Sequence, residues 1–155
     1  MEKKFMQEAI DLSRENIEKQ FGGPFGAVVV KDGKIVGKGF NHVIKNNDPT
    51  AHGEIQAIRD ACTNLKTFDL SGCEIYSSCE PCPMCLGAIF WSRIDKVYYA
   101  NTQADADEIG FDDGNFYKEF SKPIDQRSIP EIQIMYDEAK KVFDERKEKT
   151  KNILY

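Results

Sequence analysis

One histidine, one glutamate and two cysteines stand in this sequence at spacings that suit a metal-dependent reaction. A single residue separates His52 from Glu54, and Cys82 and Cys85 follow about one helix and one strand later. A histidine nitrogen and two thiolate sulfurs are ligands that zinc accepts, and three protein ligands leave the fourth tetrahedral position open to water. Glu54 is too close to His52 in sequence to be an easy fourth ligand. We therefore predict a Zn²⁺ site with His52, Cys82 and Cys85 as ligands and Glu54 as the catalytic group that moves protons beside the metal.

These residue types fit one class of hydrolysis. A bound zinc ion lowers the pKa of its water towards ~7, which makes hydroxide available at neutral pH. Attack on an amidine-like ring carbon also requires a proton on a ring nitrogen and then on the departing amine. Glu54 can take the proton of the water and deliver it to both, a role typically worth ~10²–10⁴-fold in rate. The same spacing is the signature of zinc deaminases that act on nucleobases.

Other interpretations of the cysteines stay open at this point. The sequence has five cysteines and no secretory signal, which argues against a disulfide framework. Cys82 and Cys85 could form a thioredoxin-like redox pair or stay buried without a metal. With Cys79 as a fourth ligand they could close a structural zinc site in a binding module without catalysis. Cys62 and Cys73 are expected to be small core residues.

The bulk properties indicate an ordinary globular protein. The chain has 155 residues, 41% hydrophobic and 30% charged, which is enough for one domain with a sizeable core, and we predict a single domain over 1–155. No apolar run is long enough for a signal peptide or a membrane span, so we expect no membrane partner and a cytoplasmic location.

The distribution of acidic residues argues against a nucleic-acid partner. The net charge is −5. Five acidic residues fall together without a basic residue among them, namely Asp105, Asp107, Glu108, Asp112 and Asp113. A protein that holds a phosphate backbone needs a basic stripe instead. A small uncharged substrate fits this chain better.

Periodicity and turn residues predict a β-hairpin followed by alternating helices and strands. Apolar residues at helical spacing mark a helix over the first twenty residues, and Asp32-Gly33 reads as a two-residue hairpin turn. Helices are expected at about 48–62, 81–92 and 136–151, with short helices and loops over 101–120. Strands are expected at 26–31, 34–41, 74–78, 96–100 and 132–135. This order implies a mixed sheet covered by helices on both faces.

Both halves of the zinc site are expected at helix starts. Cys82 and Cys85 lie three residues apart, so both sulfurs can face one point. Free backbone N–H groups and the positive end of the helix dipole favour their thiolate forms. His52, at the start of the other helix, can meet them if the two helices pack side by side.

Four stretches of the sequence resemble bacterial guanine deaminases of the cytidine-deaminase superfamily. They are Gly22–Ala27, Asn47–His52, Ser78–Ile89 and Gly110–Asp113. The similarity runs over nearly the whole chain, to the ending Ile153-Leu154-Tyr155. The zinc motif is shared by the superfamily and indicates the chemistry, whereas Gly110–Asp113 and the ending favour guanine.

The resemblance implies an α/β, three-layer cytidine-deaminase-like fold with a mixed five-stranded sheet between helices. It implies hydrolysis of guanine to xanthine and ammonia, a step of purine salvage or catabolism. It also implies that the tail, residues 151–155, is exchanged between the subunits of a domain-swapped homodimer.

The resemblance assigns roles to five residues around the base. Phe25 would stack on the purine and Asn41 would hydrogen-bond its ring. Asp113 would contact the amino end of the substrate and help to move protons, which makes it a second catalytic residue. Tyr155 from the partner subunit would close the pocket, and Trp91 would line it.

Simpler roles and related reactions remain as alternatives. Phe25 and Trp91 could be core residues, Asn41 a turn residue, Asp113 a solvated carboxylate, and the tail could pack on its own core. The runner-up activity is that of a tRNA adenosine deaminase, and a deaminase of cytosine or another amino-heterocycle is the third choice. Gly53 departs from many relatives, which have alanine there, and it could loosen the floor of the pocket.

Overall fold

The computed structural model describes residues 2–149. These residues belong to two compact units that divide after Gly114. The first unit contains the sheet and every predicted site residue except Tyr155, which lies outside the described residues together with the rest of 150–155. The two units are described separately below.

The first unit is built on a mixed sheet of four strands in the order β2-β1-β3-β4. The strands are β1 (Gly26–Lys31), β2 (Lys34–Phe40), β3 (Cys73–Cys79) and β4 (Lys96–Asn101). β1 is antiparallel to both β2 and β3, whereas β3 and β4 are parallel. The predicted turn joins β1 to β2, with Asp32 at φ 49° and Gly33 at φ 71°, the left-handed pair that a two-residue hairpin requires.

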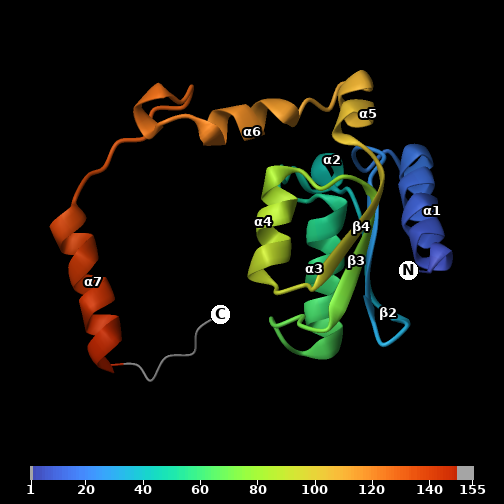
Figure 1. Cartoon of the computed structure of the whole chain (residues 1–155), viewed down its shortest axis with the longest axis horizontal. Helices are drawn as coiled ribbons and strands as arrows, with labels where there is room; N and C mark the ends of the chain where they lie inside the picture. The colour runs from blue at the N-terminus through green and yellow to red at the C-terminus, as the bar shows by residue number, and fades with distance from the viewer. Residues whose placement is uncertain (1, 150–155) are drawn as a thin grey trace. The chain divides into compact units, whose positions relative to one another are not determined.

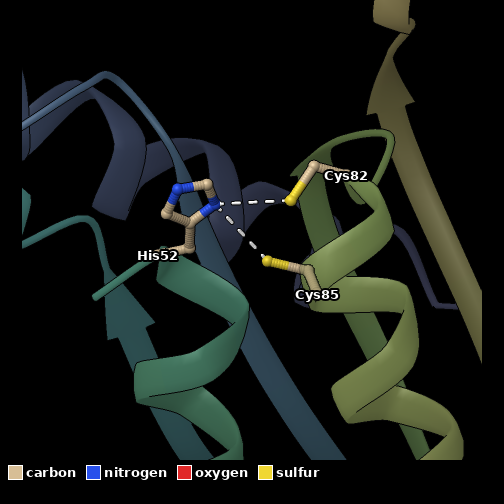
Figure 2. Close-up of side chains that lie close together, drawn as sticks. All are labelled: His52, Cys82 and Cys85. Atoms are coloured by element: carbon tan, nitrogen blue, oxygen red, sulfur yellow. Dashed lines mark hydrogen bonds between the residues drawn. The ribbon is translucent and has the colours of Figure 1, made fainter. Parts of the chain in front are cut away.

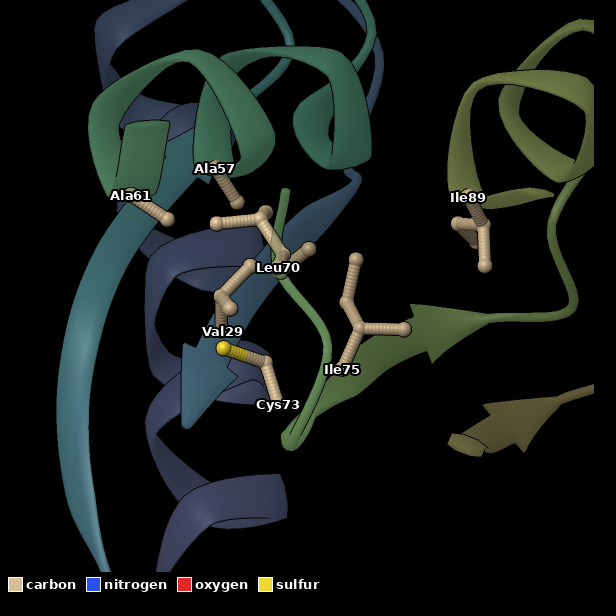
Figure 3. Close-up of a cluster of buried hydrophobic side chains, with 8 residues drawn as sticks. Val29, Ala57, Ala61, Leu70, Cys73, Ile75 and Ile89 are labelled. Carbon is tan, nitrogen blue, oxygen red and sulfur yellow. The ribbon is translucent and has the colours of Figure 1, made fainter. Parts of the chain in front are cut away.

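Helices cover both faces of this sheet and give three layers (Figure 1). Helix α1 (Lys3–Lys19) packs on one face, and α3 (Gly53–Leu65) and α4 (Pro83–Trp91) pack on the other. Alternate residues of β1 face opposite sides of the sheet and contribute to the core on each side. Val28 and Val30 pack with Phe5 of α1, whereas Ala27 and Val29 join the core beneath α3 and α4 (Figure 3). The predicted three-layer α/β arrangement with a mixed sheet is confirmed.

Glycines in β2 allow α3 to lie directly on the sheet. A Cβ atom at Gly39 would lie 2.3 Å from the backbone nitrogen of Ala57 and 2.4 Å from the carbonyl oxygen of Gly53. A Cβ at Gly37 would lie 2.4 Å from the carbonyl oxygen of Ala57. No larger residue fits there unless the helix moves. Since α3 begins beside His52, these two glycines help to set the depth of the zinc site.

The helix that carries Glu54 starts later than the sequence predicts. It begins at Gly53 rather than near Asp48, and His52 is its N-cap with extended backbone. The Asp48 carboxylate instead accepts hydrogen bonds from the backbone N–H and hydroxyl of Thr50 at 2.8 and 2.7 Å. Such a local turn competes with a helix start. A short helix that the sequence analysis missed, α2 (Val43–Asn46), precedes this turn.

The predicted fifth strand at 132–135 is wrong. Residues 131–135 have no regular secondary structure, and the sheet contains four strands among the described residues. Ile132 and Ile134 are 81% and 76% exposed. Their alternation with Gln133 imitates a strand, but a strand also needs a neighbour for its backbone hydrogen bonds.

The remaining described elements are helical. In the first unit, α5 (Gln103–Glu108) follows β4, and α6 (Gly114–Ser121) begins at the boundary of the two units. The second unit contains most of α6, a 3₁₀ turn at Ile124–Gln126 and α7 (Tyr136–Lys149). None of the described residues after Gly114 is buried. None of the described helices is long and apolar enough to cross a bilayer.

Candidate metal centre and surrounding site

The three predicted metal ligands converge from two helix starts (Figure 2). The Nδ1 atom of His52 lies 3.6 Å from Sγ of Cys82 and 3.5 Å from Sγ of Cys85. Bound to one tetrahedral zinc ion, with Zn–N of ~2.0–2.1 Å and Zn–S of ~2.3 Å, a nitrogen and a sulfur would lie roughly 3.5–3.6 Å apart. The side chains therefore already stand at the separation that zinc requires.

Hydrogen bonding and burial separate the two thiols. Hydrogen bonds from the Cys85 thiol and from His52 lower the pKa of Cys82 to about 4. Donation to Cys82, together with burial, raises the pKa of Cys85. The hydrogen bond with Cys82 in turn raises the pKa of His52. Cys82 is thus a thiolate at neutral pH, the form in which cysteine binds a metal.

Cys79 does not complete a closed site. Its sulfur donates to the carbonyl oxygen of Thr102 at 3.5 Å, and burial raises the pKa of its thiol to about 11. Among the described residues, His52, Cys82 and Cys85 are the one group whose ligand atoms lie within 4.8 Å of one another. Three donors favour the open catalytic geometry over a four-ligand structural site.

Glu54 lies beside these ligands and is almost completely enclosed. Its side chain is buried, and burial raises the pKa of its carboxyl group. One carboxylate oxygen accepts a hydrogen bond from the Ser77 hydroxyl at 3.1 Å, and the other lies 3.4 Å from the Cys85 sulfur. A carboxyl group with a raised pKa next to a metal can both accept and return a proton near neutral pH.

Two of the predicted base-binding residues lie on adjoining segments. The backbone N–H of buried Asn41 donates to the carbonyl of Phe25 at 3.0 Å. The side-chain oxygen of Asn41 accepts from the backbone N–H of Val43 at 3.0 Å, so its NH₂ group is the part that can donate to a ligand. A Cβ at Gly22 would lie 1.9 Å from that side-chain oxygen. Gly22 therefore makes room for the Asn41 side chain.

The segment that carries Asp113 packs against Phe25. The ring of Phe25 packs edge-on against Phe111 at 4.9 Å between centroids, and Asp113 donates its backbone N–H to the Phe111 carbonyl at 3.1 Å. The Asp113 carboxylate accepts from the Gln103 side chain at 3.0 Å. Its charge also contributes to raising the pKa of His52, after the hydrogen bond with Cys82 and the charges of Cys82 and Glu54. Phe25 thus contacts the segments of both Asn41 and Asp113, and Asp113 lies close enough to affect the pKa of His52.

The structure does not bring Trp91 to this site within one chain. Trp91 is the last residue of α4, and the zinc ligands are at the opposite end. With a rise of 1.5 Å per residue, roughly 9–14 Å of helix separate them. The Trp91 side chain is 68% exposed. Its role as a pocket residue stays a prediction, as does that of Tyr155.

The sequence of this chain also matches a known protein family. The sequence model for the cytidine and deoxycytidylate deaminase zinc-binding region matches residues 1–101. This chain belongs to that family. The deaminase is therefore a zinc-dependent enzyme, and His52, Cys82 and Cys85 could hold its metal.

Individual relatives of this deaminase match different shares of the chain. The guanine deaminase of Bacillus subtilis (strain 168) is 52% identical over 134 residues, which is 86% of each chain. A tRNA-specific adenosine deaminase of Aquifex aeolicus (strain VF5) is 49% identical over 77 residues, 50% of this chain and 51% of that protein.

Two solved structures of guanine deaminases superpose on this chain. The guanine deaminase structure from Bacillus subtilis superposes with a TM-score of 0.96 and 46% identity, covering 100% of this chain and 99% of that one. The guanine deaminase from Nitrosomonas europaea superposes with a TM-score of 0.67 and 38% identity, covering 71% of this chain and 64% of that one.

Two polar residues that hold the deaminase site were missed in the sequence. Ser77 faces Glu54 from the middle of β3. Asn16, fully buried in α1, donates to the carbonyl oxygens of Gly23 at 2.7 Å and Asn41 at 2.9 Å. A polar residue on the buried face of an element was the available signal, since such groups are buried only with partners.

Proposed function

We infer that this chain is a guanine deaminase that hydrolyses guanine to xanthine and ammonia. The observation that carries this inference is the 52% identity to a guanine deaminase over 86% of both chains. The match includes the segments of Asn41 and Asp113, beyond the zinc ligands that the whole family shares. Ammonia release from free guanine, adenine and cytosine at equal concentrations tests it. Guanine should be preferred by kcat/KM, and a preference for cytosine or adenine would refute the assignment.

The reaction follows from the chain's own groups together with zinc. His52, Cys82 and Cys85 would hold the zinc ion, which would supply a water molecule activated for attack near neutral pH. Glu54 accepts the first proton of that water and passes it to a ring nitrogen of the base. Glu54 then takes the second proton to the departing amino group. One C–O bond forms, one C–N bond breaks, and ammonia leaves while Glu54 returns to its starting state.

Recognition of the base rests on three residues from separate segments. Phe25 offers an aromatic face for stacking, and the NH₂ group of Asn41 offers a donor to an acceptor atom of the purine ring. Asp113 offers an acceptor for the N–H groups of guanine and helps to move protons there. A site built on buried hydrogen bonds rejects bases that leave those groups unpaired, by up to ~10⁴–10⁵-fold in favourable cases. Asp113→Asn should therefore reduce guanine turnover far more than zinc content.

The tRNA-specific activity is the second candidate, because tRNA adenosine deaminases also match this chain. The acidic segment beside Asp113 speaks against it, since a phosphate backbone requires a basic surface. Deamination of a tRNA anticodon hairpin at low and high salt tests it directly. We expect no inosine to form at either salt concentration.

We propose that the working enzyme is a homodimer in which Tyr155 closes the partner's pocket. Large apolar side chains that are exposed in the described part of the second unit support association. Phe116 and Phe120 of α6 and Phe143 of α7 are 54%, 60% and 72% exposed, and an interface would bury such large apolar side chains. Sedimentation of the full chain and of a chain ending at residue 150 tests the proposal. The shorter chain should keep zinc but lose guanine turnover and associate more weakly. A cytoplasmic location stays a prediction.

A further inference from the structure

A glutamine outside the zinc motif is fixed in contact with Asp113. The side-chain nitrogen of Gln103 donates to Oδ1 of Asp113 at 3.0 Å. A Cβ at Gly114 would lie in ordinary contact with the same amide, at 3.6 Å from its nitrogen. The Gln103 amide therefore bonds the Asp113 carboxylate and lies close to the residue that follows it.

The backbone of Gln103 is anchored from two directions. Its N–H donates to the carboxylate of Glu80 at 3.1 Å. Gln103 also opens α5 directly after Thr102, whose backbone N–H donates to the Asp105 carboxylate while its hydroxyl oxygen accepts from the Asp105 backbone N–H, which makes a capping box. A capping box holds the first turn of a helix in one arrangement. These bonds therefore fix the main-chain position of Gln103 independently of the Asp113 segment.

Glu80 connects this anchor to the zinc helix. It stands two residues before Cys82, and its backbone N–H donates to the carbonyl of Asn101 at 2.9 Å. A continuous set of hydrogen bonds thus runs from the residues next to Cys82, through Glu80 and Gln103, to Asp113. The distance between Asp113 and the metal ligands is set by this path.

The electrostatics of Asp113 show what the glutamine contributes. Burial raises the pKa of Asp113, and the nearby charges of Cys82 and Glu80 act in the same direction. The hydrogen bond from Gln103 lowers that pKa and opposes them. An amide donor therefore favours the carboxylate form, which can accept hydrogen bonds from N–H groups of a base.

We propose that Gln103 is a positioning residue for base recognition, which holds Oδ1 of Asp113 and leaves Oδ2 to accept the N–H groups of guanine. This inference rests on the proposed function, because it acts through the contact of Asp113 with the substrate. Gln103 itself need not touch the base.

Two substitutions test the role. Gln103→Leu removes the donor at similar size, and Gln103→Glu keeps the shape but places a second carboxylate against Asp113. We expect kcat/KM for guanine to fall about 10- to 100-fold in both, as for loss of a hydrogen bond to a charged group, with zinc content unchanged. The acidic limb of the pH profile of kcat/KM should also move to higher pH, because the carboxylate form of Asp113 is then harder to reach. Gln7→Leu, at an exposed glutamine of α1, is the matched control and should change neither quantity.

A double-mutant cycle separates this role from a general structural one. If Gln103 acts through Asp113, Gln103→Leu has no further effect on kcat/KM in an Asp113→Ala background. Additive losses, or an unmoved pH profile in both single variants, would overturn the inference while leaving the proposed function intact. Absence of guanine turnover in the unaltered protein would instead refute the proposed function itself. Gln103→Glu keeps the test decisive if Gln103→Leu does not fold.

Discussion

Replacing Gly39 with alanine should damage the zinc site although Gly39 touches none of its ligands. Gly39 faces the first turn of α3, where a Cβ would lie 2.3 Å from the Ala57 nitrogen and 2.4 Å from the Gly53 carbonyl oxygen. These are backbone atoms, which cannot rotate away as a side chain would. Carbon atoms settle at about 3.5–4.0 Å from their neighbours, so the start of α3 must shift by about 1 Å.

That shift acts on one half of the site alone. His52 and Glu54 flank Gly53 and move with α3, whereas Cys82 and Cys85 belong to α4. Overpacking of this kind typically costs about 1–3 kcal/mol of stability, and a misplacement of about 1 Å can cost 10²-fold in rate. We expect the Gly39→Ala protein to stay folded at 25 °C, to bind zinc more weakly and to lose about 10²-fold in guanine turnover.

Two other glycines provide controls for this prediction. Gly37→Ala brings a Cβ to 2.4 Å from the Ala57 oxygen and 2.6 Å from the Ala61 nitrogen, farther along α3, so it should cost similar stability but less activity. A Cβ at Gly87 meets nothing within 4 Å, and Gly87→Ala should stabilise α4 by roughly 0.5–1 kcal/mol. Thermal unfolding, metal analysis and ammonia release are measured on all three. If Gly39→Ala keeps zinc affinity and turnover within threefold of the parent, the seating of α3 on β2 does not position the site.

Three further predictions concern single side chains. Glu54→Gln should keep zinc and fold but lose at least ~10²-fold in single-turnover ammonia release, because an amide cannot shuttle protons; activity within a few-fold of the parent would remove Glu54 from the mechanism. Ser77→Ala should lower kcat about tenfold through loss of the hydrogen bond to Glu54, Ser77→Thr should restore it, and a failure of threonine to do so would mean that the hydroxyl has no part. Burial, and then the charges of Lys45 and Lys19, lower the pKa of His42 from its ordinary value of 6.5, so its contribution to stability is present above pH 6.5 and is lost as the pH falls through the lowered pKa. Urea unfolding at pH 7.5 and 5.5 should show a smaller loss for His42→Phe than for the parent, and an equal loss would contradict this account.

The zinc ligands and much of the first unit could be predicted from the sequence because their signals are local. The apolar run of β1, the Asp32-Gly33 turn and the cysteine spacing at the start of α4 each specify their structure within a few residues. Their convergence also follows, since His52 and Cys82 both stand at helix starts beside the central strands.

Features that depend on distant contacts were harder to predict. Gly53 is explained by the Phe25 carbonyl, whose oxygen would lie 3.0 Å from a Cβ there. Gly53 thus allows a close backbone contact rather than a looser pocket floor. The roles of Ser77 and Asn16 rest on partners 23 and 25 residues away. The alternation at Ile132 and Ile134 predicted a strand because periodicity alone cannot show whether a neighbouring strand exists.

X-ray absorption at the zinc edge of the purified protein tests the central claim most directly. The claim is that three side chains hold a catalytic zinc ion and leave one coordination position for water. The account predicts one zinc per chain with two sulfur ligands at ~2.3 Å, and nitrogen and oxygen neighbours at ~2.0–2.1 Å. A third sulfur, which only a movement of Cys79 could supply at this end of β3, would show a closed structural site and contradict the catalytic assignment.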